Sequence, residues 1–292
     1  MDIIEVRNLT KFYGRIRGAE NLTFSVKKGE IFGFLGPNGA GKTTTIRTLL
    51  GLLKPTSGTA YIFGKNIEDY IVEIRAKVGY IPGDLALYEK LTGRQFLNYF
   101  SSLRNTDLTL LDELLSIFEL PLDRKIKGYS RGMKQKMGIV QAFMDDPELV
   151  IMDEPTSGLD PLLQQKFYDF LLSEKKKGRT MFFSSHILSE VDKICDRVAI
   201  VRDGELVALE SIEDLKIKRG KFIRLKIKEN PAKFRGPKDL KILDGWIEFV
   251  ADDNINRWIK EISRFTVLDL EINEFSLEDI FMRYYEGGES ID

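Results

Sequence analysis

A glycine-rich turn between an apolar run and a helical pattern constrains the fold of this chain more than any other feature. The apolar run is residues 31–35, and apolar side chains recur at helical spacing over residues 43–53. The turn between them reads Gly36, Pro37, Asn38, Gly39, Ala40, Gly41, Lys42 and Thr43. Glycines followed by Lys and Thr, between a strand and a helix, are typical of a loop whose amides hold a triphosphate. We expect Lys42 to reach the β and γ oxygens and act in catalysis, and Thr43 to offer its hydroxyl to Mg²⁺.

The length and composition of the chain fit a protein of about two domains with a sizeable core. It has 292 residues, of which 43% are hydrophobic and 30% charged, and a formal net charge of -1. These values disfavour wholesale disorder and a chain-wide field for nucleic acid. No apolar stretch approaches the roughly 18 residues that a membrane-spanning helix needs. Cys195 is the only cysteine and the amino terminus does not resemble a secretory signal, so a reducing, cytosolic compartment is expected.

Short apolar runs followed by helical patterns predict an α/β fold with a largely parallel sheet. Further buried strands are expected at residues 78–81, 149–152, 181–184 and 198–201. Residues 22–26 and 59–63 instead predict an accessory antiparallel sheet. Strand signals vanish between about residues 92 and 144, where apolar side chains recur every three or four residues. We therefore expect a helical insertion over about residues 84–145.

A change of pattern near residue 215 predicts a boundary between a first domain, residues 1–215, and a small α+β domain, residues 216–292. In the second domain, apolar and charged residues alternate over residues 223–228 and again over residues 268–273, which predicts two half-buried strands. The first of these strands is basic and the second is acidic. The basic residues suit anionic lipid headgroups, but pairing with the acidic strand is the simpler interpretation.

Other patterns in the second domain predict a third strand over residues 246–250 and a helix with an apolar stripe at Ile255, Trp258, Ile259 and Ile262. Ser276, three residues before Asp279, predicts the start of a last helix.

Two carboxylates follow the predicted strand at residues 149–152, at the sheet edge where ligands of parallel α/β proteins gather. Adjacent strand side chains face opposite ways, so Asp153 and Glu154 need separate roles. We expect Asp153 to hold Mg²⁺ and Glu154 to orient and deprotonate the attacking water. His186, the only histidine, ends another predicted strand. It is expected to donate a hydrogen bond to the γ-phosphate.

The segment Tyr129, Ser130, Arg131, Gly132, Met133, Lys134, Gln135 makes the combination more specific. Together with the phosphate-binding loop and the acidic strand, it resembles the ATP-binding subunit of ABC transporters, in the exporter-type form of that family's signature. Ser157, Gly158, Leu159 and Asp160 are similar to the family's D-loop, His186 to its switch histidine and Tyr13 to its adenine-stacking aromatic. The resemblance covers roughly residues 2–215.

The resemblance implies a P-loop NTPase (RecA-like) core with an antiparallel β subdomain and a helical insertion, which binds ATP and Mg²⁺ and hydrolyses ATP. It implies that two copies close head to tail, each ATP lying between the phosphate-binding loop of one and the signature of the other. The residues expected at the nucleotide are Tyr13, the loop from Gly36 to Thr44, Ser130, Gly132 and Asp160.

Transport requires membrane-spanning subunits, which are expected to be separate permease chains on which this protein lies at the inner face of the cell membrane. Export is favoured over import only by resemblance to exporter-type subunits in the signature and in the carboxyl-terminal extension. The alternative, a soluble ABC ATPase acting mechanically on nucleic acid or ribosomes, usually has two cassettes or a long coiled coil. This chain has one phosphate-binding loop, so no nucleic-acid partner is expected. A GTPase is disfavoured because the sequence has no Asn-Lys-x-Asp guanine element.

One position departs from the family pattern. Where the family usually has a glutamine that senses Mg²⁺ and the attacking water, this chain has Gly83 followed by Asp84. The interpretations that stay open are that Asp84 substitutes through a water molecule, or that Glu154 and backbone groups suffice and Asp84 is a turn residue. The loop from residue 83 to 91 contains Leu85, Leu87, Tyr88 and Leu91, which either dock the permease or pack in the core.

Overall fold

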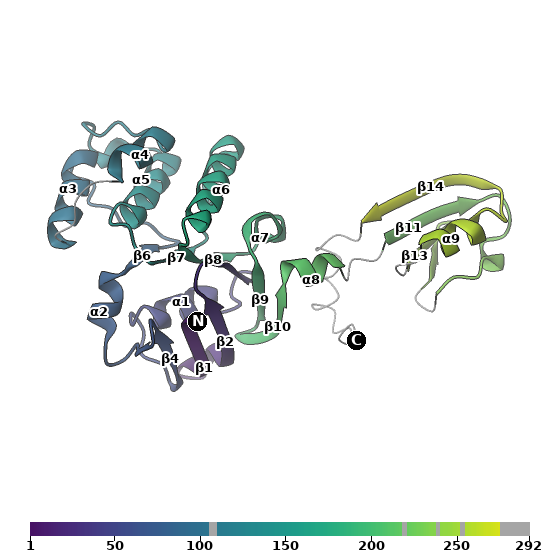
Figure 1. Ribbon diagram of the computed structural model, residues 1–292, viewed down its shortest axis with the longest axis horizontal. Coiled ribbons are helices and arrows are strands. Elements are labelled where there is room, and N and C mark those ends of the chain that lie inside the picture. Colours follow the sequence, from purple (N-terminus) through teal and green to yellow (C-terminus); the bar gives the residue numbers. More distant parts are fainter. Residues whose placement is uncertain (105–109, 218–220, 238–239, 252–254, 275–292) are drawn as a thin grey trace. The chain divides into compact units, whose positions relative to one another are not determined.

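The computed structural model describes residues 1–104, 110–217, 221–237, 240–251 and 255–274 (Figure 1). The chain forms two compact units, Met1–Ser211 and Ile212–Asp292. The division lies close to the boundary expected after residue 215. The helix expected from Ser276 onward lies outside the described residues.

A six-stranded sheet in the order β10-β9-β3-β8-β7-β6 forms the centre of the first unit. Its strands are β3 Ile31–Leu35, β6 Val78–Ile81, β7 Leu149–Asp153, β8 Thr180–Ser185, β9 Arg197–Arg202 and β10 Glu205–Ser211. The strands from β9 to β6 pair in parallel, and β10 pairs with β9 antiparallel. All residues of β3, β7 and β8 are buried, because both faces of the sheet are covered. The carboxyl ends of these three strands meet at one edge.

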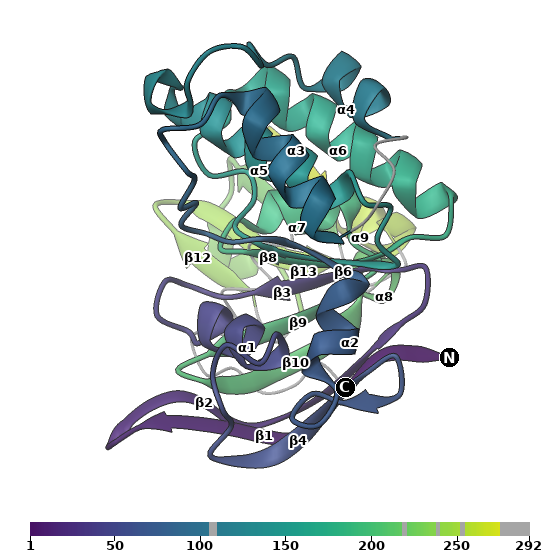
Figure 2. The same cartoon turned by 90° about the vertical axis from the view of Figure 1, so that its left-hand side faces the viewer.

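Helices cover one face of this sheet, and a helix and a second sheet cover the other (Figures 1 and 2). The helices on the first face include α5 Arg131–Phe143, α6 Pro161–Lys176 and α7 Leu188–Ile194. On the other face, α1 Lys42–Leu49 lies between the central sheet and an antiparallel sheet of order β2-β1-β4-β5. That sheet consists of β1 Asp2–Tyr13, β2 Ile16–Lys27, β4 Ser57–Ile62 and β5 Lys65–Asn66. One core joins both sheets, since Phe24 of β2 stacks on Phe32 of β3 with ring centroids 5.5 Å apart.

The structure confirms the helical insertion that the spacing of apolar residues predicted, and it lies between β6 and β7. It contains α3 Gly93–Arg104, α4 Leu111–Ile117, the 3-10 turn η1 Ile126–Gly128 and the first part of α5. Phe118, which is fully buried, packs edge-on against Phe170 of α6 with ring centroids 5.5 Å apart. A short helix, α2 Ile71–Ala76, precedes β6. Among the residues that the structure describes, no helix is long and apolar enough to cross a membrane.

The second unit is a four-stranded antiparallel sheet of order β12-β13-β11-β14, with a helix packed on one face. Its elements are α8 Ile212–Ile217, β11 Lys221–Ile227, η2 Pro231–Lys233, β12 Lys241–Leu243, β13 Trp246–Ala251, α9 Ile255–Ile262 and β14 Val267–Glu274. Ile223, Leu225 and Phe249 of the strands form a core with Trp258 and Ile262 of α9. The sequence pattern missed β12, because this edge strand has only three residues and all are exposed.

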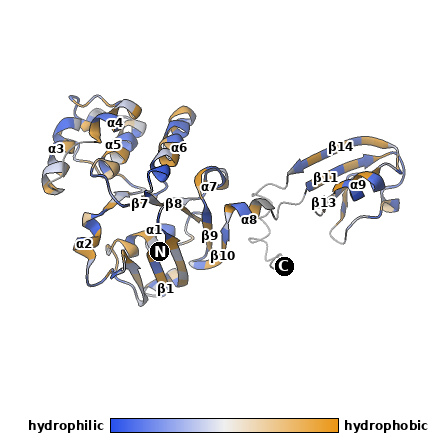
Figure 3. Cartoon of the chain, in the orientation of Figure 1, coloured by the Kyte–Doolittle hydropathy of each residue, from blue (hydrophilic) through white to orange (hydrophobic). Residues whose placement is uncertain are grey.

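The alternation along β11 and β14 is visible in Figure 3, and the two strands are neighbours. Arg224 lies opposite Glu271, and Lys226 lies opposite Asp269. The Arg224 guanidinium also contacts Glu248 Oε1 of β13 at 2.9 Å. These pairs confirm that the basic strand is matched by acidic neighbours on the same face of the sheet.

Candidate nucleotide-binding site

Glycines shape the loop between β3 and α1. Gly39 and Gly41 have φ angles of +86° and +96°, a region that L side chains rarely adopt. A Cβ atom on Gly41 would lie 2.1 Å from the Gly18 carbonyl oxygen, and one on Gly36 would lie 2.4 Å from that of Val201. Gly36 and Gly41 therefore lack room for a side chain, and the backbone itself forms the surface of the loop.

The amino end of α1 provides an anion-binding site. The first helical hydrogen bond runs from the Thr45 amide to the Gly41 carbonyl at 2.9 Å. The amides of Lys42, Thr43 and Thr44 precede that bond, so no carbonyl of the helix accepts from them. No side chain caps this helix. These amides and the helix dipole favour a phosphate group at this position.

The ammonium group of Lys42 lies over the same loop. Its Nζ donates to the carbonyl oxygens of Gly36 at 2.7 Å and Pro37 at 3.0 Å, and it lies 3.2 Å from Glu154 Oε1. The Pro37 oxygen also accepts from the Ala40 amide at 3.2 Å. The Lys42 side chain is only 5% exposed, so its charge is directed into the site.

Asp153 lies at the end of β7, and both of its carboxylate oxygens accept hydrogen bonds. Thr43 Oγ1 donates to Oδ2 at 2.8 Å, and Ser184 Oγ donates to Oδ1 at 2.7 Å. The Thr43 hydroxyl and the carboxylate are the hard oxygen ligands that Mg²⁺ prefers. Within the described part of the chain, no group of three or more His, Cys, Asp or Glu side chains is placed to hold a metal. An ion held by Thr43 and Asp153 would take its other ligands from phosphate oxygens and water.

The backbone conformation that directs Glu154 into the site was not predicted from the sequence. Glu154 follows β7 with a φ of +48°, so its side chain does not continue the alternation of the strand. Its Oε1 lies 3.2 Å from both Lys42 Nζ and His186 Nδ1. The backbone is held because the Glu154 amide donates to Ser184 Oγ at 3.1 Å. Asp153 and Glu154 thus both face the phosphate-binding loop, each with different partners.

Tyr13 forms one wall of a cavity of about 300 Å³ beside this loop. The lining residues are Tyr13, Ile16, Arg17, Gly18, Asn38, Gly39, Gly41, Lys42, Thr43, Thr44 and Glu154. The ring of Tyr13 is exposed, its hydroxyl oxygen is 3.4 Å from Thr44 Oγ1, and Lys11 Nζ lies 5.5 Å from its centroid. A Cβ on Gly18 would approach Tyr13 Cε2 to 2.8 Å, so glycine lets the ring lie against this strand. The open face of the ring is suited to stacking on a base.

Six of the residues expected at the nucleotide do not line this cavity: Gly36, Pro37 and Ala40, which belong to the phosphate-binding loop itself, and Ser130, Gly132 and Asp160, which lie at the starts of two other helices. Ser130 is the N-cap of α5, where its Oγ accepts from the Met133 amide at 3.2 Å, and Gly132 lies in the first turn of the same helix. Asp160 is the N-cap of α6, where its Oδ1 accepts from the Leu163 amide at 3.0 Å. A single chain therefore brings together the phosphate-binding loop, the acids and His186, but not the signature.

The strand end before His186 contains residues to which the sequence argument gave no separate role. Ser184 contacts Asp153 and Glu154, as described above. The next residue, Ser185, accepts a hydrogen bond from the Gly36 amide through its carbonyl oxygen at 3.2 Å. Ser185 Oγ also donates to the buried carboxylate of Glu190. Tyr168 donates to the same carboxylate at 3.0 Å, and burial together with Glu190 raises the pKa of Tyr168. The sequence signal for these contacts was the run Ser184, Ser185, His186, because hydroxyl groups at a strand end can form hydrogen bonds with neighbouring loops.

Gly83 lies directly beside Asp153. A Cβ added to Gly83 would be 3.4 Å from Asp153 Oδ2, so the backbone follows the path that would point a glutamine at the site. Nearby, burial and the charge of Asp153 raise the pKa of Tyr80 to about 12, which keeps that hydroxyl neutral. Asp84 is exposed.

We predict that Asp84→Ala lowers the ATPase rate at least several-fold, because Asp84 is the acidic side chain next to the missing glutamine and can hold a water against the site. Steady-state ATP hydrolysis by the assembled transporter checks this. Asp69→Ala, on the loop before α2, serves as the control and should leave the rate unchanged. A wild-type rate for Asp84→Ala would identify Asp84 as a turn residue only.

Sequence comparisons agree with the geometry. A family model described as ABC transporter matches residues 19–157. The bacitracin transport ATP-binding protein BcrA of Bacillus licheniformis is 37% identical over 301 residues, which cover 98% of this chain and 98% of that protein. An uncharacterized ABC transporter ATP-binding protein of Nostoc sp. is 42% identical over 209 residues, which cover 69% of this chain and 62% of that longer protein.

Solved structures extend the comparison to the fold. An ATP-binding subunit of an ABC transporter matches with a TM-score of 0.68 at 34% identity, covering 73% of this chain and 92% of that chain. The ATP-binding cassette MJ0796, in a dimeric post-hydrolysis state bound to ADP and Pi, matches with a TM-score of 0.66 at 25% identity, covering 72% of this chain and 98% of that chain. The site geometry, the P-loop NTPase core and the relatives of nearly equal length all indicate the same family. The chain belongs to the ABC transporter family, and it is an ATP-binding and ATP-hydrolysing subunit of that family.

Proposed function

We propose that this protein powers export through separate permease subunits, on which it lies at the cytoplasmic face of the membrane. Support for export comes from relatives that match along the whole chain, including the second unit. The BcrA protein is named for bacitracin transport, and a Mycobacterium tuberculosis relative, 35% identical over 292 residues, is named for fluoroquinolone export. The soluble mechanical ATPase is not favoured by these relatives.

The observation that carries the proposal is the division of the expected nucleotide contacts into two groups. Tyr13 and the phosphate-binding loop line the cavity, while Ser130 and Gly132 lie at the start of α5 outside it. A helix start with a serine cap and a glycine is a second anion site. We propose that a second copy of the chain supplies this second site, so that two chains close head to tail around each ATP.

Within that arrangement each residue of the site has a distinct task. Lys42 and the first amides of α1 bind the β and γ phosphates, and Thr43 and Asp153 would hold Mg²⁺, which would neutralise phosphate charge. Glu154 accepts the proton of the attacking water. His186, 3.2 Å from Glu154, orients that carboxylate and donates to the γ-phosphate. Asp160, the last residue of the D-loop, caps the start of α6.

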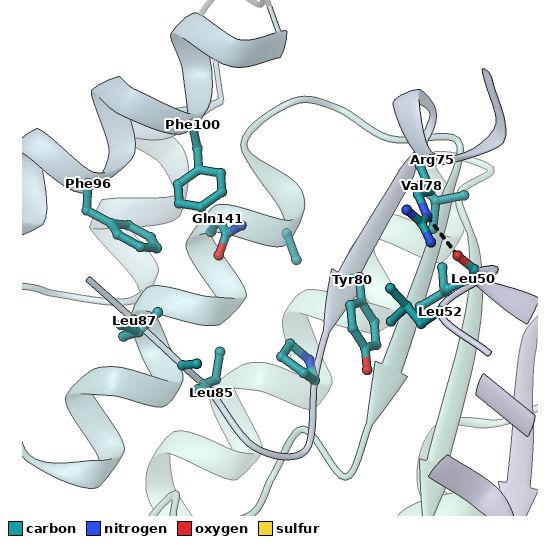
Figure 4. A pocket seen from close by; sticks show the side chains of 13 residues that line it. Leu50, Leu52, Arg75, Val78, Tyr80, Leu85, Leu87, Phe96, Phe100 and Gln141 are labelled. Carbon is teal, nitrogen blue, oxygen red and sulfur yellow. Dashed lines mark hydrogen bonds between the residues drawn. The ribbon is translucent and has the colours of Figure 1, made fainter. Parts of the chain in front are cut away.

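A pocket of about 320 Å³ between the sheet and the helical insertion provides a docking surface for the permease. Figure 4 shows side chains from both sides of it, among them Leu50, Leu52, Val78 and Tyr80 on one side and Leu85, Leu87, Phe96 and Phe100 on the other. The expected docking residues have different roles. A Cβ on Gly138 would approach Leu85 Cδ2 to 2.7 Å, so Leu85 packs against α5. Leu87 is half-buried and Tyr88 is exposed, which leaves these two accessible to an apolar side chain of a permease helix.

The proposal is tested by isolating the full-length chain from its own membranes. We expect a multispanning membrane protein to co-purify, to be identified by mass spectrometry and to stimulate the ATPase. Leu87→Asp should reduce its recovery about tenfold or more, because burying an unpaired carboxylate in an apolar contact is costly, while ATP binding is retained. Leu103→Asp is the matched control, since Leu103 is 63% exposed and does not line the pocket. Equal recovery with both variants would contradict docking here, and finding only ribosomal or nucleic-acid partners would contradict transport.

A further inference from the structure

The signature helix is fastened to the loop that follows the catalytic glutamate in the same chain. Arg131 Nη2 donates to Ser157 Oγ at 2.7 Å, and Gln135 Nε2 donates to the Pro155 carbonyl oxygen at 2.6 Å. Gln135 is only 6% exposed. Residues at positions i and i+4 of a helix lie on one face. One face of α5 therefore lies against the loop over residues 155–158.

This contact has no free space. A Cβ on Gly158, whose φ is +82°, would lie 2.8 Å from Arg131 Nε, and a Cβ on Gly132 would lie 3.3 Å from the Gly158 carbonyl oxygen. Gly132 thus lets the helix start approach the backbone of the loop, and Gly158 leaves room for the Arg131 side chain. Close-packed contacts transmit displacement rather than absorb it.

The same loop controls the backbone of Glu154. The Ser157 amide donates to the Glu154 carbonyl oxygen at 3.1 Å, while the Ser157 hydroxyl accepts from Arg131. Two hydrogen bonds through one serine therefore connect Arg131 with Glu154. Glu154 has a left-handed backbone, with a φ of +48°, which persists in a non-glycine residue only when its surroundings hold it. The loop and Ser184 supply that restraint.

We infer that Arg131 and Gln135 are positioning residues that connect the two ATP sites of a dimer. When the nucleotide of the partner binds at Ser130, the start of α5 is fixed, and Arg131 and Gln135 then fix the loop that places this chain's own Glu154. This inference rests on the head-to-tail dimer proposed above. It assigns these residues no contact with the reacting atoms, so they affect the rate through the position of Glu154.

A double-mutant cycle on the full-length chain tests the connection. The variants are Arg131→Ala, Ser157→Ala and the double variant, with kcat and KM measured for ATP hydrolysis. We expect each single variant to lower kcat about tenfold with little change in KM, and the double variant to be no worse than either single one, because each breaks the same hydrogen bond. Gln135→Ala should lower kcat similarly, and Arg131→Lys, which keeps a donor, should recover part of the rate. Lys136→Ala on the same helix, which bonds to the Glu119 carbonyl in the helical insertion, should match the parent.

The dimer is followed separately in a Glu154→Gln background by gel filtration with ATP and Mg²⁺. We expect Arg131→Ala and Gln135→Ala to leave dimer formation intact, whereas Ser130→Ala abolishes it. Additive effects of Arg131→Ala and Ser157→Ala would show that the two residues act independently, and loss of the dimer with Arg131→Ala would show that Arg131 acts at the dimer interface; either result would overturn the inference. Wild-type kcat in all variants would overturn it as well. Failure of the Glu154→Gln parent to dimerise would instead overturn the proposed dimer itself, and the inference with it.

Discussion

Glu154→Gln is expected to lower the turnover of ATP by about 10² to 10⁴, the usual effect of removing a positioned general base. The amide has the size of the carboxylate, so the contacts with Lys42 Nζ and His186 Nδ1, each 3.2 Å from Oε1, change in charge but not in space. The donors proposed to bind phosphate are untouched, and ATP affinity should be retained. Because hydrolysis no longer opens the closed state, the variant should accumulate as an ATP-bound dimer. Rapid-quench measurement of ATP cleavage and gel filtration with ATP and Mg²⁺ check both results.

A matched control lies just before the other end of the same strand. Glu148→Gln, which removes an exposed partner of Lys77, should leave both turnover and association unchanged. A Glu154→Gln variant that elutes only as a monomer at saturating ATP would contradict the proposed dimer. Turnover near that of the parent would show that another group takes the proton.

Arg179→Ala is expected to destabilise the first unit by about 3 kcal/mol, because it breaks a buried ion pair and leaves the buried carboxylate of Glu174 with fewer partners. Arg179 and Glu174 are 8% and 3% exposed and lie 2.6 Å apart. The guanidinium also bonds to the carboxylate of Asp146 and the carbonyl of Pro147, so it joins the end of α6 to the loop before β7. We place the loss at the low end of the usual range because Lys177 still pairs with Glu174 at 2.7 Å.

The position of the tryptophans gives this experiment an internal control. Trp246 and Trp258, the only two in the chain, both lie in the second unit. Urea unfolding followed by circular dichroism should therefore shift in Arg179→Ala, while the transition seen by tryptophan fluorescence stays in place. Arg94→Ala, which breaks an exposed pair with Asp123, should cost at most about 1 kcal/mol. A circular dichroism transition unchanged by Arg179→Ala would contradict the role given to this pair.

The sequence was informative wherever a pattern is local. The phosphate-binding loop could be predicted because strand, glycines, lysine and helix are contiguous, and the helical insertion because apolar residues repeat at short intervals. The pairing of β11 with β14 could also be predicted, since opposite charges at matching spacing, such as Arg224 and Glu271, identify neighbouring strands.

What could not be predicted depends on contacts between distant segments or on unusual backbone. The direction of the Glu154 side chain depends on its left-handed φ, which alternation along a strand does not reveal. The contact of Arg131 with Ser157 joins residues 26 positions apart, and Glu190 becomes relevant only because α7 brings it under Ser185. The signature residues were recognised by resemblance, but only the structure shows that they lie outside the cavity.

The end of β8 has a consequence for how this region can vary. Ser184 forms hydrogen bonds with Asp153 and Glu154, and Ser185 forms hydrogen bonds with Gly36 and Glu190. The next residue, His186, pairs with Glu154. In a strand, deleting or inserting one residue turns each side chain to the opposite face. A single-codon deletion here would therefore disconnect several parts of the site at once. Insertions and deletions in this segment should be tolerated far less than insertions and deletions in the three-residue edge strand β12.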